Sequence, residues 1–266
     1  MNKKSFFKVS ILMTFFNEEK FIQRSIKSLI NQSFKDWEAV IVDDCSTDNS
    51  ADIIKKFKDQ RIKYFKLQQH KGRTSALNFG LQKCRGRFIS ILDADDFYFK
   101  KNLKKQIKLL KRDKEIKFLA SWGKLIDSEG KKISTFKAPK SIEKIKKKLF
   151  TTNIIGHSSI IYDKNFAKKN NLIPYKYDYA VDYELTLKFL KITKVHVIPE
   201  SLVAFTLRGD SVSYLNENKI KVITDDLKSI DYVKKNFTID FNDKMNIEFK
   251  KLKLILKLIL TKVRIM

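Results

Sequence analysis

Two carboxylates, Asp93 and Asp95, follow the apolar segment 87–92, and Asp96 lies directly beside them. Carboxylates this close repel one another unless a cation or hydrogen-bond donors neutralise them. Oxygen ligands of this kind suit Mg²⁺ or Mn²⁺, which can share its coordination sphere with a substrate phosphate. Taken alone, an Asp-x-Asp sequence more often marks a solvated turn or a helix cap. The three residues therefore need other polar groups beside them to form a site.

Three other polar clusters follow apolar segments in the same way. Asn17 and Glu18 come after residues 8–16, Asp44 comes after residues 38–43, and Arg73 ends a polar stretch after residues 62–67. The Asp44 cluster could equally be an Asx turn that caps the next helix. Phe16 could be a core residue or a platform on which a base stacks.

The segments before these clusters read as strands, and the segments between them read as helices. The apolar runs predict strands at 8–16, 38–43, 62–67 and 87–92, and the helical patterns start at Asn17, which can cap the first helix, and span 51–58 and 75–84. This alternation predicts an α/β doubly wound, mostly parallel sheet with helices on both faces. In such sheets ligands bind beyond the carboxyl ends of the strands, where all four clusters should lie.

The remainder of the chain is less regular. We expect a helix at 102–112, a hairpin formed by 118–127 and 131–136, a helix at 141–150, a strand at 157–162, a helix at 182–192, an extended segment at 195–207, and a Lys-rich helical tail from 217. The expected division is an α/β domain at 1–215, with a first half at 1–98 that carries the four polar clusters and a second half at 99–215, followed by a basic helical extension at 216–266.

Several function classes lack their motif in this sequence. There is no G-x-G-x-x-G, no P-loop and no nucleophile elbow, which argues against dinucleotide dehydrogenases, P-loop NTPases and serine hydrolases. A sugar-phosphate nucleotidyltransferase would need a Gly-rich loop after the first strand, where this chain has Phe-Phe-Asn-Glu. Cys45 and Cys84 are too few for a disulfide framework or a Cys-based zinc site.

Four motifs together resemble the family 2 glycosyltransferases of the GT-A fold. They run from Val9 to Glu19, from Val42 to Asp48, from Lys71 to Gly80 and from Leu92 to Asp96, in the order and spacing of that family. The resemblance is strong over residues 7–110 and looser over 150–213. It implies an inverting transfer of sugar from a nucleotide sugar, usually a UDP-sugar, with Mn²⁺ or Mg²⁺. The implied acceptor is a hydroxyl of a lipid-linked or cell-surface glycan, such as lipopolysaccharide, capsule or O-antigen.

The resemblance also assigns roles on the donor side, position by position. Thr14, Phe16 and Glu18 stand where the family lines the base pocket, and Asp44 stands where a carboxylate accepts from the uracil N3–H. Arg73 approaches the nucleotide. Asp93 would face the ribose and sugar, and Asp95, together with Asp93, would hold the metal and diphosphate. The family's Ala-Arg-Asn is Ala76-Leu77-Asn78 here, which removes one charge contact.

On the acceptor side, the segment 180–185 resembles the family motif that carries the catalytic base. Asp182 is therefore the expected base, which takes the proton from the attacking hydroxyl, and Glu184 is the fallback. The alternative is that Asp182 only caps a helix. His157, with Asp96, is expected beside the sugar and acceptor pocket, although a core histidine is nearly as good an interpretation. Arg208 opens a stretch, continuing through Asp210, Ser211 and Ser213, that resembles a family loop closing over the diphosphate.

The charge of the chain is strongly positive. It has 56 Lys and Arg residues against 30 Asp and Glu, for a net charge of +26. Most of the cations are Lys, whereas base-reading surfaces favour Arg, so no nucleic-acid partner is expected. A compositional bias toward Lys, with solvated lysines on every helix, explains the excess about as well as a membrane-surface role does. The alternative to an enzyme is an inactive transferase-fold protein that serves as a basic membrane-surface or nucleic-acid binding module.

The last eighteen residues, 249–266, form an amphipathic helical pattern. One face would carry eight large apolar residues, namely Phe249, Leu252, Ile255, Leu256, Ile259, Leu260, Val263 and Met266. Lys250, Lys253, Lys257 and Arg264 would occupy the other side. This pattern is typical of a helix lying on an anionic membrane surface. A terminal helix that packs this face on the domain or on another subunit would show the same pattern. We expect a cytoplasmic protein that can bind the inner face of the membrane.

Overall fold

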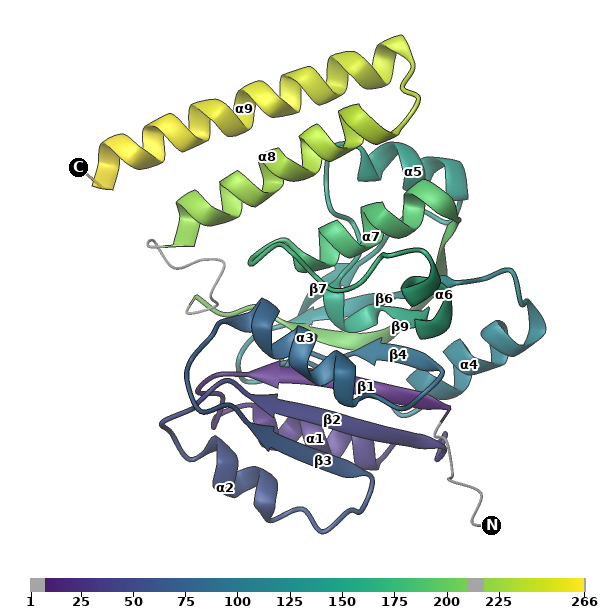
Figure 1. Cartoon of the computed structure of the whole chain (residues 1–266), viewed down its shortest axis with the longest axis vertical. Coiled ribbons are helices and arrows are strands. Elements are labelled where there is room, and N and C mark those ends of the chain that lie inside the picture. Colours follow the sequence, from purple (N-terminus) through teal and green to yellow (C-terminus); the bar gives the residue numbers. More distant parts are fainter. Residues whose placement is uncertain (1–7, 210–217, 266) are drawn as a thin grey trace.

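The structure is a computed structural model that describes residues 8–209 and 218–265, with side chains to residue 261. Asp210, Ser211 and Ser213 of the predicted diphosphate loop lie outside the described residues. The described part forms a twisted central sheet with helices on both faces, and a pair of long C-terminal helices covers one end (Figure 1).

The amino-terminal half follows the predicted alternation closely. Its parallel strands are β1 (Val9–Phe15), β2 (Trp37–Asp43), β3 (Ile62–Lys66) and β4 (Phe88–Ile91), in the spatial order β3-β2-β1-β4. Its helices are α1 (Ile22–Ile30), α2 (Ser50–Lys55) and α3 (Arg73–Lys83). The central strands β1 and β2 are mostly apolar because both of their faces are covered: Leu12 packs into one core cluster and its neighbour Ile11 into the other.

The second half extends this sheet with mixed strand directions. Its strands are β5 (Phe97–Tyr98), β6 (Phe118–Ile126), β7 (Lys132–Phe136), β8 (Ile161–Asp163) and β9 (Val195–Thr206), and its helices are α4 (Asn102–Arg112), α5 (Ile142–Leu149), α6 (Lys164–Lys169) and α7 (Val181–Ile192). Beyond β4 the order is β8-β6-β9-β5, and β7 pairs with β6. In this half only β6 and β9 pair in parallel among the described strands.

Two local predictions were wrong. Asn17 does not cap the first helix, because its φ of 56° is left-handed and its side chain accepts from the backbone N–H of Thr47 at 2.9 Å. The helix begins at Ile22 instead. Residues 157–162 are not one strand: residues 157–159 form a short 3₁₀ helix, η1, and only Ile161–Asp163 pair as β8. The 3₁₀ turn points Ser158 toward the end of β4, where its hydroxyl hydrogen bonds with the backbone N–H of Asp93 at 2.9 Å.

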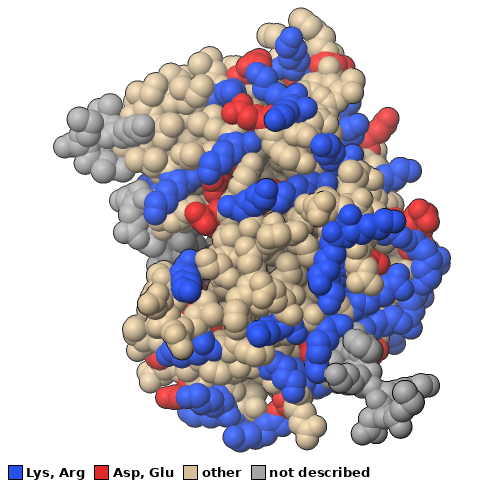
Figure 2. All heavy atoms as spheres, in the orientation of Figure 1, with Lys and Arg blue, Asp and Glu red and all other residues tan. Residues whose placement is uncertain are grey.

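The C-terminal helices, α8 (Lys219–Asn236) and α9 (Phe241–Ile265), run antiparallel over α7 and α5 (Figure 1). Ile223, Ile230 and Val233 of α8 are buried in the same core cluster as α7. Within the described residues, no helix has the length and apolar character needed to cross a membrane. Lys and Arg side chains are spread over the face drawn in Figure 2, from α9 to the lower edge of the sheet.

Candidate active site

The carboxyl ends of β1, β2 and β4 meet at one edge of the sheet, as predicted, and residues 93–96 follow β4 there. Asp96 is buried and anchors this segment. Its carboxylate accepts from Ser158 Oγ at 2.5 Å and from the backbone N–H of Thr206 at 2.8 Å. Burial, together with the charges of Asp95 and Asp93, raises its pKa well above the usual range. Asp96 therefore holds β4, η1 and β9 together.

Asp93 forms a charged triad with Arg73 and His157. Its Oδ1 lies 2.7 Å from Arg73 Nη2 and 2.9 Å from His157 Nδ1. Burial opposes the ionisation of Asp93, but Arg73 and His157 outweigh it and lower its pKa. Nε2 of His157 is buried and has no hydrogen-bond partner within the described part of the chain. The imidazole thus has Nδ1 close to both Asp93 and Arg73, and a buried Nε2 on its other side.

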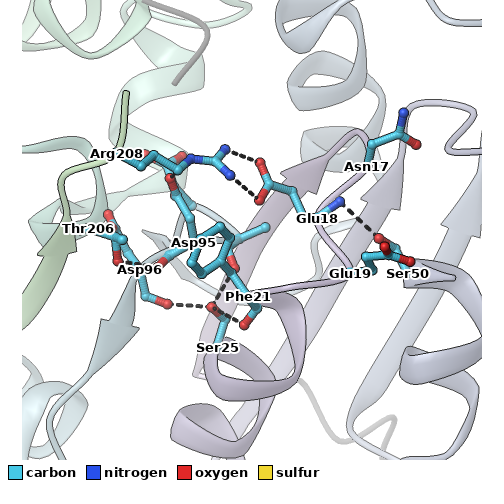
Figure 3. A network of polar contacts seen from close by, with 12 residues as sticks. Asn17, Glu18, Glu19, Phe21, Ser25, Ser50, Asp95, Asp96, Thr206 and Arg208 are labelled. Carbon is cyan, nitrogen blue, oxygen red and sulfur yellow. Dashed lines mark hydrogen bonds and ion pairs between the residues drawn. The ribbon is translucent and has the colours of Figure 1, made fainter. Parts of the chain in front are cut away.

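Asp95 belongs to a second ion-pair group, drawn in Figure 3. Its Oδ2 lies 3.1 Å from Arg208 Nε, and the two Nη atoms of Arg208 donate to the two oxygens of Glu18. The Arg208 guanidinium also lies 4.9 Å from the centre of the Phe21 ring. Burial and the nearby Asp93 raise the pKa of Asp95, and Arg208 opposes this shift. Arg208, placed after β9, thereby joins the ends of β1 and β4.

Arg73 is the first residue of α3, which packs on β1 and β2. A Cβ at Gly80 of this helix would lie 2.4 Å from Leu12 Cδ1 and 2.9 Å from Val42 Cγ2, so a larger residue there would require these side chains to move. Burial alone would lower the pKa of Arg73, but Asp93, Asp182 and Asp95 outweigh it and raise the pKa. The three carboxylates expected to face the sugar, to act as the base and to bind the metal therefore all stabilise the positive charge of the Arg73 guanidinium.

The predicted base pocket lies beside β1 and β2. Phe16 is 40% exposed, and its ring centre lies 4.1 Å from that of His70. Asp44 is buried, and its two oxygens accept from the backbone N–H groups of Lys71 and Gly72 at 2.9 and 2.7 Å. Thr14 is half-buried near the end of β1. Asp44 thus shapes the turn that leads to Arg73 in addition to facing the pocket edge.

Asp182 and Glu184 differ sharply although both lie in the first turn of α7. Asp182 is half-buried, and its Oδ2 accepts from Asn153 Nδ2 at 2.8 Å. Glu184 is 4% exposed; its Oε2 accepts from the backbone N–H groups of Lys176 and Tyr177, and its Oε1 lies 2.6 Å from Lys188 Nζ. Glu184 therefore positions the segment before α7, and Asp182 is the carboxylate that a substrate can reach.

The sequence did not reveal three residues that position this site. Ser158 ties η1 to both Asp93 and Asp96. Thr206 fixes Asp96 through its backbone and lies within hydrogen-bonding distance of Arg24 at 2.9 Å. Asp225 of α8 accepts from the backbone N–H groups of Asp178 and Tyr179 at 3.1 and 3.0 Å. Ser158 stands beside His157 in a stretch that resembles the family, but its sequence position gives no sign of these contacts. Thr206 and Asp225 stand in no motif, because all three residues act across more than forty residues of sequence.

The carboxylates offer a divalent metal two oxygen donors. Asp93 and Asp95 have side chains 28% and 18% exposed, and carboxylate oxygen is the donor type that Mg²⁺ and Mn²⁺ prefer. The described residues contain no group of three or more His, Cys, Asp or Glu that could hold a metal ion. The donor set therefore fits an ion that completes its coordination with substrate oxygens, rather than one enclosed by protein ligands alone.

The sequence profile of Glycosyl transferase family 2 matches residues 10–170 of this chain. An uncharacterized glycosyltransferase of Methanocaldococcus jannaschii is 32% identical over 224 residues, which cover 80% of this chain and 76% of the relative. An Escherichia coli protein, UDP-Glc:alpha-D-GlcNAc-diphosphoundecaprenol beta-1,3-glucosyltransferase WfgD, is 30% identical over 213 residues, which cover 80% and 81% of the two chains.

Two solved structures have the same fold. Residues 1–349 of Staphylococcus aureus TarS, in complex with UDP-GlcNAc, superpose with a TM-score of 0.69 at 22% identity, and the match covers 90% of this chain and 70% of that TarS fragment. The mannosyltransferase PcManGT of Pyrobaculum calidifontis, in complex with GDP-Man and Mn²⁺, gives a TM-score of 0.68 at 15% identity over 96% and 73% of the chains. The predicted GT-A fold is thereby confirmed.

Proposed function

The chain belongs to glycosyl transferase family 2 and is a glycosyltransferase, and from this premise we propose that it moves a sugar from a UDP-sugar to a hydroxyl of a lipid-linked or cell-surface glycan, with inversion at the anomeric carbon. One observation carries the proposal. Asp93 and Asp95, the residues expected to serve sugar and metal, pair with Arg73 at 2.7 Å and with Arg208 at 3.1 Å, so two guanidinium groups flank the segment that follows β4. A donor diphosphate placed at this segment would lie between the two guanidinium groups.

The donor base is proposed to bind between Phe16 and the Asp44 turn. Phe16 offers an exposed ring, and base–aromatic stacking is worth roughly 1–3 kcal/mol. Each carboxylate oxygen can accept two hydrogen bonds, and within the described residues Asp44 Oδ1 accepts only from the backbone N–H of Lys71. Oδ2 faces both the Gly72 N–H and His70 Nδ1, so Oδ1 is proposed to accept from the uracil N3–H. The name of the E. coli relative, which includes UDP-Glc, supports uridine as the base.

Asp95 and Asp93 would hold a divalent ion through their carboxylate oxygens. When bound, such an ion stabilises the negative charge that develops on the departing diphosphate. Arg73 and Arg208 supply positive charge on either side of the two carboxylates, which suits a diphosphate anion. The buried Nε2 of His157 is proposed to hydrogen bond with a hydroxyl of the donor sugar.

Asp182 is proposed to act as the base. The acceptor hydroxyl attacks the anomeric carbon, its proton passes to a carboxylate oxygen of Asp182, and the bond from that carbon to the diphosphate breaks. The Asn153 amide donates to Asp182 Oδ2 and so fixes the orientation of the carboxylate. The first turn of α7 also stabilises its negative charge, since the helix dipole is positive there.

The acceptor is proposed to be a sugar carried on a lipid diphosphate. The E. coli relative, which shares 30% identity over four-fifths of each chain, is named for a GlcNAc-diphosphoundecaprenol acceptor. The segment 176–179 leads into α7 and Asp182, and Glu184 and Asp225 hold it in place. This segment would set which acceptor sugar can approach the base.

The test is release of UDP from a panel of UDP-sugars by the purified full chain, with Mn²⁺, with Mg²⁺ and after chelation. We expect metal-dependent UDP release with at least one donor. The variant Asp95→Asn should abolish the metal response, while Asp52→Asn, the same change at an exposed carboxylate of α2, should leave it unchanged. No release from any nucleotide sugar under any condition would contradict the proposal and favour a binding module with an inactive transferase fold.

A further inference from the structure

Large apolar side chains are exposed mainly on a single helix. Twelve such side chains are exposed in the described part of the chain, and eight of them lie on α9: Phe241, Met245, Phe249, Leu252, Ile255, Leu256, Ile259 and Leu260. Soluble monomers rarely expose a contiguous apolar patch of this kind, and such patches mark interaction sites. The patch is far from the donor pocket, so the proposed catalytic chemistry does not use it.

The exposed side chains form one continuous face. On a helix of about 3.6 residues per turn they fall on the side opposite Ile247 and Leu254, which are 1% and 5% exposed. Ile247 and Leu254 belong to the main core, with Leu258 packed beside them. The helix therefore attaches to the protein through one narrow face while its larger apolar face is uncovered. The face predicted from sequence as the membrane-binding side is thus not the side that packs on the domain.

The charges around this face favour an anionic surface. Residues 249–266 contain six Lys or Arg and no Asp or Glu. On the helix, Lys253 and Lys257 border one edge of the apolar face and Lys244 borders the other. The two acids of α9, Asp243 and Glu248, lie near its start, where they pair with Lys147 and Lys234 of the domain. Figure 2 shows an area without charged side chains beside the end of α9, with Lys and Arg side chains directly below it.

From these observations we propose that the outer face of α9 is a membrane-docking surface, which lies in the interfacial region of a bilayer that contains anionic lipid. Helices that bind in this way carry a large apolar face bordered by Lys or Arg, which contact the headgroups while the apolar side chains enter the acyl boundary. A second copy of this chain is a poorer occupant, because two such faces would bring the bordering lysines of both helices together.

The position of α9 links this surface to the acceptor side. Its partner α8 holds Asp178 and Tyr179 through Asp225, and these residues lead directly into α7 and Asp182. The C-terminal end of α9 lies on the side of the molecule to which the strands of the donor edge point (Figure 1). Should the acceptor be lipid-linked, as proposed above, a docked enzyme would meet it at the membrane surface; the docking itself does not rest on that function.

The experiment is sedimentation of the full chain with vesicles made of equal parts phosphatidylglycerol and phosphatidylcholine, compared with pure phosphatidylcholine. We expect at least tenfold stronger partition onto the anionic vesicles, weakened by added salt because part of the attraction is electrostatic. The double variant Leu252→Ser/Leu256→Ser should lower partition about tenfold or more, since two large apolar groups no longer enter the bilayer.

The matched control is Ile133→Ser/Ile192→Ser, which makes the same kind of change at two exposed isoleucines elsewhere. It should bind vesicles as the unaltered chain does. Equal vesicle binding by both double variants would overturn the proposal. So would a dimer that forms without lipid and dissociates in the Leu252→Ser/Leu256→Ser variant. The vesicle experiment contains no sugar donor or acceptor. A negative result would therefore overturn the docking proposal without bearing on the proposed transferase activity, which the UDP-release assay tests separately.

Discussion

The donor edge and the acceptor side use carboxylates in opposite ways. At the donor edge, Asp93 and Asp95 form ion pairs with the guanidinium groups of Arg73 and Arg208, so both partners of each interaction are side chains. On the acceptor side, Glu184 and Asp225 accept from backbone N–H groups and fix the path of the chain. A side-chain ion pair can exchange its partner for a phosphate or a metal, whereas a carboxylate that holds backbone amides is part of the scaffold.

Two carboxylates on the same turn of α7, Asp182 and Glu184, differ in burial and in their hydrogen-bond partners. Asp182 is half-buried and has two hydrogen-bond partners, the Asn153 amide and the backbone N–H of its neighbour Tyr183, whereas Glu184 is buried and has three partners from other segments and its own helix. Asp44 is the exception at the donor edge, because it also holds two backbone N–H groups. Position relative to the site therefore does not decide the role of a carboxylate; its partners do.

The largest effect should come from Asp182→Asn. An amide cannot accept the acceptor proton, so kcat should fall on the order of 10²-fold or more. The fold should be intact, because the substituted side chain is half-buried and isosteric. The measurement is steady-state UDP release with acceptor, together with thermal unfolding. A variant that turns over at a near-normal rate would move the base to another residue.

Glu184→Gln should lower stability and leave kcat nearly unchanged, which is the opposite of the effect expected for Asp182→Asn. The neutral amide loses the ion pair with Lys188 and weakens two charge-assisted hydrogen bonds from the backbone, which should cost about 2 kcal/mol of unfolding free energy. In the folded enzyme, kcat should stay within a few-fold of normal. Urea unfolding and UDP release on the same preparation give both values. Full stability with a collapse of kcat would show that the base is Glu184 rather than Asp182.

Phe16→Ala should act on donor binding alone. Loss of the exposed ring should raise the KM for the UDP-sugar about tenfold, which corresponds to about 1.4 kcal/mol of lost stacking. Stability should hardly change, because the ring is 40% exposed and belongs to neither core cluster of the described residues. The control is Phe16→Tyr, which keeps an aromatic ring and should bind the donor normally. An unchanged KM in the alanine variant would make Phe16 a packing residue.

The donor edge was largely predictable from the sequence because its polar residues follow their strands directly. Asp44 and Asp93 each come within two residues of a buried strand, and parallel strands bring their carboxyl ends together. The acceptor side was less predictable. Ser158 reaches Asp96 across 62 residues and Asp225 reaches Tyr179 across 46, so no local pattern records these contacts. Glu184 was a plausible base in the sequence, and only its burial shows that it holds the backbone.

The smallest expected effect tests whether α8 belongs to the acceptor side. Asp225→Asn replaces a buried carboxylate that accepts from Asp178 and Tyr179 and pairs with Lys228. Weakening these hydrogen bonds should cost about 1 kcal/mol of unfolding free energy. If the segment before α7 positions the acceptor, the KM for acceptor should rise a few-fold while the KM for donor is unchanged. The matched control is Asp231→Asn, which removes an exposed partner of Lys251 on the same helix and should alter neither constant. Equal changes in both KM values would mean that α8 stabilises the whole domain, and the contrast between the two sides would then lie within residues 8–209 alone.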